Sequence, residues 1–262
     1  MEAADFSKKY GPWALVTGAA EGLGAEFARQ VAASGIATLL VDVQIEKAQA
    51  QAEEIARDCG VETRAIACDL ADPDFLAELI GQTGELEVGL LICCAGYGTV
   101  GSFLKTPLEA MKRMTQINCM STLELSHHYA AEMAARGRGG ILILASTSAY
   151  AGAPYVANYA ATKAYDLSLG EALWFELAPL GIDVLAFSPQ GTNTPGFRRG
   201  SPHIKEGEAS EGVMLPAEAV RIALGGLGRL ASLRPDLPES ESAKRQVIVQ
   251  MAGEYMSNLA ES

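Results

Sequence analysis

The chain has 262 residues, of which 49% are hydrophobic and 20% charged, and its formal net charge is −12. This composition is typical of a globular protein, and the acidic balance argues against a nucleic-acid surface, which needs clustered Lys and Arg. No apolar run approaches the roughly 18 residues of a membrane span, and the first residues lack the pattern of a signal peptide. We therefore expect a cytoplasmic protein without nucleic-acid or membrane partners.

Short apolar runs alternate along the chain with segments of helical spacing. The predicted strands are 13–17, 37–41, 63–68, 89–94, 141–145 and 182–187. The predicted helices are 25–34, 45–58, 72–81, 108–136, 159–177 and 216–229. Continuously apolar strands that alternate with helices predict an α/β fold: a single Rossmann domain over residues 1–262, with a doubly wound parallel sheet and helices on both faces.

Two later segments depart from this alternation. Residues 191–215 are rich in Gly and Pro with mixed charge, and a loop of that length is usually functional, so we predict a substrate lid. A mobile surface insertion is the alternative. Residues 235–244 are polar and predicted to be irregular, while 246–249 fit either a short strand or the start of a last helix.

Cysteine and histidine spacing predicts neither disulfides nor a metal site. The cysteines are odd in number and several lie in apolar runs, which indicates free thiols in a reducing compartment. They are Cys59, Cys68, Cys93, Cys94 and Cys119. Neighbouring strand residues point to opposite faces, so a disulfide between Cys93 and Cys94 is not expected. The histidines have no Cys or carboxylate at metal-ligand spacing.

A glycine-rich turn joins the first predicted strand to the first helix. Residues 17–24 read Thr-Gly-Ala-Ala-Glu-Gly-Leu-Gly, and glycines here permit a tight turn and close backbone approach to a pyrophosphate at the helix N-terminus. The spacing is not that of a Walker A loop, and no Gly-Lys-Ser/Thr follows, so NTP hydrolysis has no support. The turn predicts dinucleotide binding, with a purely structural glycine turn as the alternative.

Acidic residues follow the second and third predicted strands. Asp42 lies where a carboxylate can accept both ribose hydroxyls and repel a 2′-phosphate. Glu21 adds a second negative charge, and the two residues after Asp42 provide no cation, so electrostatics favours NAD(H) over NADP(H). Asp69 is placed either to accept a hydrogen bond from an adenine amino group or to cap the helix that follows.

Tyr159 and Lys163 lie four residues apart in a predicted helix and therefore share one face. A fixed positive charge stabilises the phenolate form of a tyrosine, which makes the phenol useful for proton transfer. Ser146 follows the strand at 141–145, so it reaches the same rim of the sheet as the start of this helix. Two residues at this spacing are common in helices, and the pair gains meaning only from the nucleotide-binding half that precedes it.

With both halves in view, the chain resembles the classical short-chain dehydrogenase/reductase family over nearly its whole length. Residues 17–24 correspond to the family's glycine signature, Asp42 to the acidic residue of its NAD-dependent members, and residues 189–194 to its Pro-Gly motif. The resemblance implies a catalytic tetrad of Asn118, Ser146, Tyr159 and Lys163. It also implies cofactor contacts from Gly18, Glu21, Gly22, Leu23, Gly24, Asp42, Asp69, Leu70, Ala95, Gly96, Tyr159, Lys163, Pro189, Gly191, Thr192 and Thr194.

The resemblance further implies the role of each tetrad residue. Tyr159 exchanges a proton with the substrate oxygen, Lys163 binds the nicotinamide ribose, Ser146 hydrogen-bonds the reacting oxygen, and Asn118 holds a water that links Lys163 to solvent. Ser148 and Tyr155 are placed either to face the substrate or to pack internally.

The chain departs from the family pattern in three places. Cys93 and Cys94 replace the usual Asn-Asn, which predicts altered bracing of the sheet but retained cofactor binding, because Gly96 still allows close approach. Gln190 stands where glycine is usual and is expected to narrow the nicotinamide end. The C-terminal stretch shows no clear seventh strand.

We therefore expect an NAD(H)-dependent oxidoreductase that acts on a hydrophobic secondary alcohol or ketone, with steroid-like and aromatic compounds as the candidate substrates. Apolar residues in the predicted lid favour such a substrate: Phe197, Ile204, Val213, Met214 and Leu215. The alternatives are carbonyl reduction as the main direction, epimerisation or dehydration of a nucleotide sugar, and non-catalytic NAD(H) sensing. A hydrolase is disfavoured because no Gly-x-Ser-x-Gly elbow occurs.

The family resemblance also implies a homodimer or homotetramer formed through the helices that bear Asn118 and Tyr159. Apolar residues on the outer side of the second helix are compatible with this interface, and burial in the subunit's own core explains them equally well. These residues are Tyr165, Leu169, Leu173 and Trp174.

Overall fold

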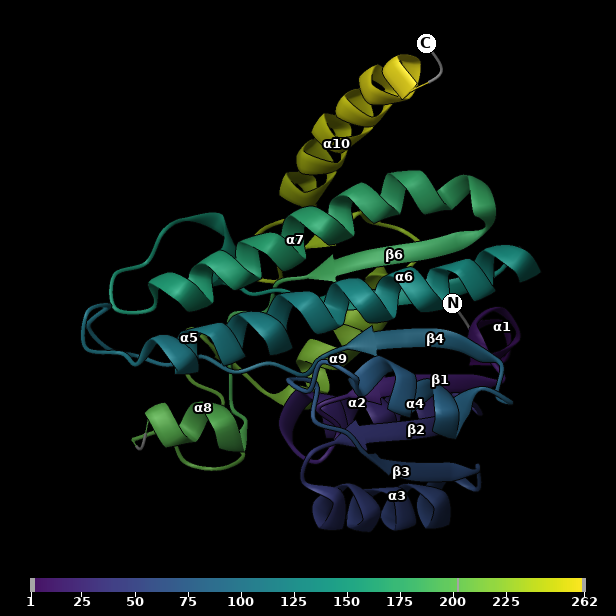
Figure 1. The fold of residues 1–262 in the computed structure, drawn as a ribbon, viewed down its shortest axis with the longest axis horizontal. Coiled ribbons are helices and arrows are strands. Elements are labelled where there is room, and N and C mark those ends of the chain that lie inside the picture. Colours follow the sequence, from purple (N-terminus) through teal and green to yellow (C-terminus); the bar gives the residue numbers. More distant parts are fainter. Residues whose placement is uncertain (1–2, 202, 261–262) are drawn as a thin grey trace.

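The computed structural model describes residues 3–201 and 203–260. Within these residues, seven parallel strands form one sheet in the order β3-β2-β1-β4-β5-β6-β9 (Figure 1). The strands are β1 (Trp13–Thr17), β2 (Ala37–Asp42), β3 (Thr63–Ala67), β4 (Val88–Cys93), β5 (Gly139–Leu144), β6 (Ile182–Phe187) and β9 (Ser232–Leu233). The order reverses between β1 and β4, and open α/β sheets bind ligands at the carboxyl ends of strands beside such a reversal. The predicted Rossmann fold is confirmed.

Helices cover both faces of the sheet because successive strand residues point to opposite faces. In β1, Ala14 and Val16 belong to one buried cluster, and Trp13 and Leu15 belong to the other. The first cluster includes residues of α1 (Ala3–Tyr10), α2 (Gly22–Ala33), α3 (Ile45–Cys59) and α9 (Pro216–Gly226). The second includes residues of α4 (Phe75–Thr83) and α6 (Ser121–Arg136), and partly buried residues of α7 (Ala157–Leu177) pack against it.

The long helix predicted from 108 to 136 continues without a break but changes its winding. It consists of α5 (Leu108–Thr115), a π-helical turn η1 (Gln116–Met120) and α6. Single π turns inside α-helices occur frequently at functional sites, and this one carries Asn118.

At the N-terminal end, α1 was not predicted, and its tyrosine, Tyr10, joins it to the sheet. Tyr10 is completely buried and donates a hydrogen bond of 2.6 Å from its hydroxyl to Asp183 at the start of β6. The helix predicted at 72–81 begins later, at Phe75, because Asp72 Oδ1 accepts a hydrogen bond from Asp74 N and holds the preceding residues in a turn.

At the C-terminal end two predictions were wrong. A short seventh strand exists, since β9 pairs with Ala186 and Phe187 of β6. Residues 235–244 are not irregular throughout, because α10 (Glu239–Ala260) begins within them and also accounts for 246–249 as helix. In Figure 1, α10 (yellow) leaves α7 and extends beyond the rest of the molecule. In the part of the chain that the structure describes, no helix is both long and apolar enough to cross a membrane.

Candidate active site

The glycine turn between β1 and α2 leaves no room for larger side chains. Gly18 has a φ of 68°, and a Cβ there would lie 2.8 Å from Ala95 Cα at the end of β4. A Cβ on Gly24 would lie 2.0 Å from the carbonyl oxygen of Gly18. Thr17 Oγ1 accepts hydrogen bonds from Cys94 N at 3.1 Å and Ala95 N at 3.0 Å, which ties the turn to β4. The turn therefore exposes backbone without side chains, which allows a dinucleotide to approach it closely.

The N-terminus of α2 faces this turn without a side-chain cap. Glu21 occupies the N-cap position in an extended conformation, and its carboxylate makes no capping hydrogen bond. The first backbone N–H groups and the positive end of the helix dipole therefore remain available for an anionic group such as pyrophosphate. The chemistry of this turn fits a nicotinamide dinucleotide.

Asp42 and Glu21 lie at the edge predicted to receive the adenosine ribose. Asp42 accepts hydrogen bonds from Ala20 N at 3.0 Å and from Gln44 N at 2.9 Å, so part of its capacity holds the turn itself. Glu21 forms ion pairs with Lys47 at 3.2 Å and with Arg199 at 2.9 Å. Burial raises the pKa of Glu21, but these two cations outweigh it, and the pKa lies below its ordinary value.

The sequence analysis found no cation in the two residues after Asp42, but the structure places two cations at this edge. Lys47 lies on the first turn of α3, and Arg199 comes from the segment predicted to be a lid. Sequence reasoning considered only the two residues directly after Asp42. Lys47 lies only five residues after Asp42, which was a usable signal, whereas nothing in the sequence linked Arg199 to Glu21.

Asp69 is held by Arg113 of α5. The guanidinium reaches both carboxylate oxygens at 2.9 Å, and Asp69 Oδ1 also accepts a hydrogen bond from Ala71 N. Burial raises the pKa of Asp69, but Arg113 and the Ala71 N–H lower it by more, so the pKa lies below its ordinary value. Because α4 begins only at Phe75, the prediction that Asp69 caps this helix was wrong. The adenine contact stays a prediction, as does the contact from the buried neighbour Leu70.

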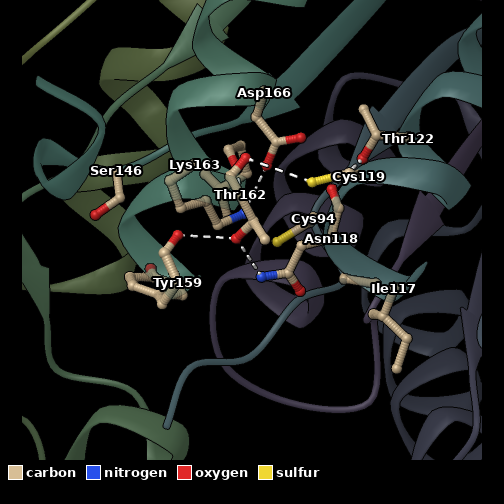
Figure 2. A network of polar contacts seen from close by, with 12 residues as sticks. Cys94, Ile117, Asn118, Cys119, Thr122, Ser146, Tyr159, Thr162, Lys163 and Asp166 are labelled. Carbon is tan, nitrogen blue, oxygen red and sulfur yellow. Dashed lines mark hydrogen bonds and ion pairs between the residues drawn. The ribbon is translucent and has the colours of Figure 1, made fainter. Parts of the chain in front are cut away.

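The tetrad predicted from the family resemblance comes from three parts of the chain (Figure 2). Tyr159 and Lys163 lie one turn apart on α7, and Ser146 begins the 3-10 turn η2 (Thr147–Tyr150) that follows β5. Ser146 Oγ accepts a hydrogen bond from Ser148 N at 3.2 Å, so its hydroxyl hydrogen is free to bind another oxygen. A Cβ on Gly98 would lie 2.8 Å from the Tyr159 ring, so the loop after β4 lies directly against the phenol.

Asn118 is fully buried and joins this loop to α7. Its Nδ2 donates to Tyr97 O at 3.0 Å and to Thr162 Oγ1 at 2.9 Å, and its Oδ1 accepts from Tyr97 N at 3.1 Å. Both amide hydrogens are therefore used within the protein. The amide fixes the loop against the helix that carries Tyr159, and the predicted water relay stays a prediction.

Lys163 is almost completely buried, and two groups fix its ammonium. Nζ donates to the carbonyl oxygen of Leu144 at 2.7 Å and to Asp166 Oδ2 at 3.0 Å. Burial by itself lowers the pKa of Lys163, but Asp166 and Tyr159 outweigh it, and the pKa lies above its ordinary value. A Cβ on Gly96 would lie 3.4 Å from Nζ, which places the ammonium beside the same bare backbone that borders the glycine turn.

Comparison with known proteins shows the family of this chain. Residues 12–204 match the short chain dehydrogenase family. The chain belongs to the short chain dehydrogenase family. It is 28% identical to a 7β-hydroxysteroid dehydrogenase of Clostridium sardiniense, over 98% of this chain and 100% of the relative.

Two solved structures are similar in fold. A short-chain dehydrogenase of Sphingobium yanoikuyae in complex with NADPH has a TM-score of 0.80 and 29% identity, and the match covers 95% of this chain and 96% of that one. The bulky-bulky ketone specific alcohol dehydrogenase of Comamonas testosteroni has a TM-score of 0.79 and 28% identity, with 95% and 94% covered.

At two of the departures from the family pattern, the Cys93-Cys94 pair and Gln190, the structure shows what surrounds the side chains. Burial raises the pKa of the Cys93 and Cys94 thiols to about 12. Thr17 braces the end of β4 at this point through the Cys94 and Ala95 N–H groups. Gln190 is half-buried, and its carbonyl oxygen accepts a hydrogen bond from Thr192 Oγ1 at 3.0 Å. Its narrowing of the nicotinamide end stays a prediction.

The segment predicted to be a lid contains regular structure. It consists of β7 (Gly191–Thr192), the short helix α8 (Pro195–Gly200) and β8 (Val213–Met214), which pairs with β7. A Cβ on Gly22 would lie 3.2 Å from Thr194 Cβ, so the base of the segment touches the glycine turn. The segment therefore borders the predicted dinucleotide cleft, while its role as a substrate lid stays a prediction.

Exposed apolar residues lie on a different loop from the one predicted. The residues named for the lid are half-buried or, for Met214, buried. The loop after β4 instead exposes Val100, Phe103 and Leu104, the last at 92%. Tyr155, predicted to face substrate or to pack, is exposed and lines a small cavity together with Phe103 and Tyr159. Sequence reasoning missed this loop because its apolar residues are scattered and show no strand or helix period.

Proposed function

We propose that this protein is an NAD(H)-dependent oxidoreductase that interconverts a hydrophobic secondary alcohol and its ketone. The observation that carries the proposal is the meeting of two halves at one edge of the sheet. Ala95 borders Gly18 of the glycine turn, and the next residue, Gly96, borders the Lys163 ammonium, which supports a dinucleotide cradle and a proton-transfer group side by side.

A bound nicotinamide supplies or takes up the hydride. The chain's own residues handle the proton and the oxygen. Tyr159 accepts the hydroxyl proton in oxidation or donates it in reduction, and Ser146 donates a hydrogen bond to the reacting oxygen. Lys163 holds a positive charge one turn from the phenol, and Asn118 fixes the loop that packs on the Tyr159 ring.

The apolar loop after β4 supports a hydrophobic substrate. Val100, Phe103 and Leu104 are exposed near the cavity that Tyr159 lines, where a nonpolar skeleton would cover them. Similarity to a 7β-hydroxysteroid dehydrogenase and to an alcohol dehydrogenase specific for bulky-bulky ketones supports a large, steroid-like alcohol or ketone.

The two carboxylates at the ribose edge support NAD(H) over NADP(H). Asp42 and Glu21 would both repel a 2′-phosphate. Lys47 and Arg199 oppose this effect, but each is already paired with Glu21. A similar structure holds NADPH, so a protein of this fold can bind the phosphorylated cofactor, and the proposed preference for NAD(H) depends on these side chains.

Two further proposals accompany the activity. A cytoplasmic location agrees with five cysteines that are all unpaired in the described residues. A homodimer or homotetramer agrees with Tyr165, exposed on the outer side of α7, although Leu169, Leu173 and Trp174 of the same helix pack against the core.

Replacement of the phenol hydroxyl tests the activity. Tyr159→Phe should lower kcat with a panel of bulky secondary alcohols by at least about 100-fold, the usual contribution of a general acid or base. NADH binding, measured by fluorescence titration, should change little. Retained turnover in the variant, or no NADH binding by the unmodified protein, would overturn the proposal.

A further inference from the structure

Lys163 is buried together with a second charged residue, Asp166, which is not part of the tetrad. Asp166 lies three residues further along α7, and its carboxylate is 1% exposed while the Lys163 side chain is 5% exposed. Asp166 Oδ2 accepts the 3.0 Å hydrogen bond from Lys163 Nζ. Figure 2 shows the Lys163 side chain between Asp166 on one side and Tyr159 on the other.

The fold itself makes little use of Asp166. Its second oxygen, Oδ1, is buried and has no hydrogen-bond partner among the described residues. A buried carboxylate retained only for structure normally satisfies both oxygens with backbone N–H groups or hydroxyls, because an unsatisfied buried acceptor costs stability. The 3.0 Å bond to Lys163 is instead the polar contact that this carboxylate makes.

Few other charges face Lys163. On α7 the titratable groups beside it are Tyr159 and Asp166, and from the elements packed against α7 come the thiols of Cys93, Cys94 and Cys119. Burial raises the pKa of each of these thiols to about 12, so they carry no charge near neutral pH. Asp166 is therefore the anion that compensates the Lys163 ammonium.

An ammonium in this position needs such compensation. Removing a lysine from water favours its neutral form and can lower its pKa by several units when no anion is near. The carbonyl oxygen of Leu144 is a second acceptor at 2.7 Å, but it carries no full charge. With two Nζ hydrogens directed to Leu144 and Asp166, one remains for a group in the cleft beside Gly96.

We propose that Asp166 is a positioning residue for this oxidoreductase: its carboxylate keeps the Lys163 ammonium charged and fixes its direction between β5 and α7. The inference rests on the proposed function, because it assigns Asp166 a role in the reaction that Lys163 serves. Asp166 acts through Lys163 and touches neither substrate nor cofactor.

Asp166→Asn separates charge from shape. The amide oxygen can still accept the hydrogen bond from Lys163, but the negative charge is lost. Burial then acts on Lys163 without an opposing anion, so its pKa should fall by about 1–3 units. The charged form of Lys163 would be lost as the pH rises through this lower value. The alkaline limb of the pH–activity profile should therefore move to lower pH.

The first test needs no turnover and no cofactor. In protein labelled with 13C at the lysine ε-carbon, NMR titration follows the Lys163 signal, which Lys163→Arg identifies. In the unmodified protein Lys163 should titrate above the ordinary lysine value of about 10.4, and in Asp166→Asn below it. Titration of the unmodified Lys163 below that value would overturn the proposal even if the variant failed to fold.

The second test measures kcat and KM from pH 6 to 10. Asp166→Asn should lose activity at pH 9 by at least about tenfold more than at pH 7, with the loss in kcat. Glu176→Gln, which removes an exposed charge from the same helix, is the control and should match the unmodified enzyme. A uniform loss at all pH values with an unchanged Lys163 titration would mean that Asp166 has only a structural role. Absence of turnover in the unmodified protein would instead refute the proposed function and leave the NMR result to decide the role of Asp166.

Discussion

At the scale of single residues, cofactor choice depends on a carboxylate that serves two purposes. Asp42 holds the glycine turn through Ala20 N and Gln44 N while it presents negative charge to the ribose edge. Asp42→Asn should therefore weaken the binding of NAD+ and reduce the enzyme's discrimination against NADP+. Loss of a hydrogen bond to a charged group costs about 1.5–3 kcal/mol, which corresponds to a rise in the KM for NAD+ of about 10–100-fold.

Steady-state kinetics with both cofactors measures this effect. Asp58→Asn, at an exposed position on α3, is the matched control and should leave both KM values unchanged. Equal kcat/KM for NAD+ and NADP+ in the unmodified enzyme would contradict the assignment of Asp42 as the discriminating residue.

The cysteines give a second prediction at this scale, based on pKa. Burial raises the pKa of Cys68 to about 11 and those of Cys93, Cys94 and Cys119 to about 12. Because the thiolate is the reactive form, at pH 8 these groups should react with iodoacetamide at least about 100-fold more slowly than a thiol of ordinary pKa near 8.5. Peptide mass spectrometry of the labelled native protein should find Cys59 modified first. All five should react in urea, and rapid labelling of Cys94 in the native state would contradict the prediction.

At the scale of elements, the sequence predicted the strands that have a local apolar pattern. It missed the elements that depend on contacts with distant segments. The central strands β1 and β4 are buried on both faces, so their apolar residues alone were enough to recognise them. β9 has two residues and exists only through its pairing with β6, which no local pattern reveals. The start of α10 is polar, so its sequence alone predicted an irregular segment. Ion pairs with residues far away in the sequence stabilise this part of the helix, and no local pattern reveals them.

The anchor of α10 can be tested by one substitution. Arg245 donates to both carboxylate oxygens of Glu171 on α7, one of them at 2.9 Å, and Glu171 also accepts from Ser232 Oγ of β9 at 2.7 Å. Arg245→Ala would leave the buried Glu171 carboxylate without its cation. Because Arg245 is partly exposed, we expect a loss of about 1–3 kcal/mol, less than for a fully buried pair.

Thermal unfolding and hydrogen exchange measure this loss. The Tm should fall by about 3–8 °C, and the backbone amides of α10 should exchange faster than those of α7. Lys244→Ala removes an exposed partner of Glu241 in the same turn and should change neither. Equal exchange in α10 of the Arg245→Ala variant and the unmodified protein would show that this pair does not hold the helix.

At the scale of the whole molecule, the sequence predicted only those parts of the site whose residues lie close together in the chain. Tyr159 and Lys163 share a helix face by spacing alone, and the glycine turn is fixed by its neighbours in sequence. The contacts of Glu21 with Arg199 and of Asn118 with Tyr97 join segments whose distance in space depends on the complete fold. Asp166 was within reach of sequence reasoning, three residues after Lys163, but its burial could not be known before α7 was placed against the sheet.

Association of whole subunits gives the last prediction. Leu123 of α6 and Tyr165 of α7 are exposed at 36% and 37%, on the two helices expected to form the subunit interface. Burial of such apolar side chains against a second copy would stabilise a dimer. The double variant Leu123→Glu/Tyr165→Glu should therefore shift the molar mass, measured by light scattering during size exclusion, towards the monomer while circular dichroism stays unchanged. Ile248→Glu, on the exposed side of α10, is the comparison. A monomeric unmodified protein would refute the predicted assembly. A shift to monomer only with Ile248→Glu would place the contact on α10, because burying an unpaired charge in an apolar interface weakens it.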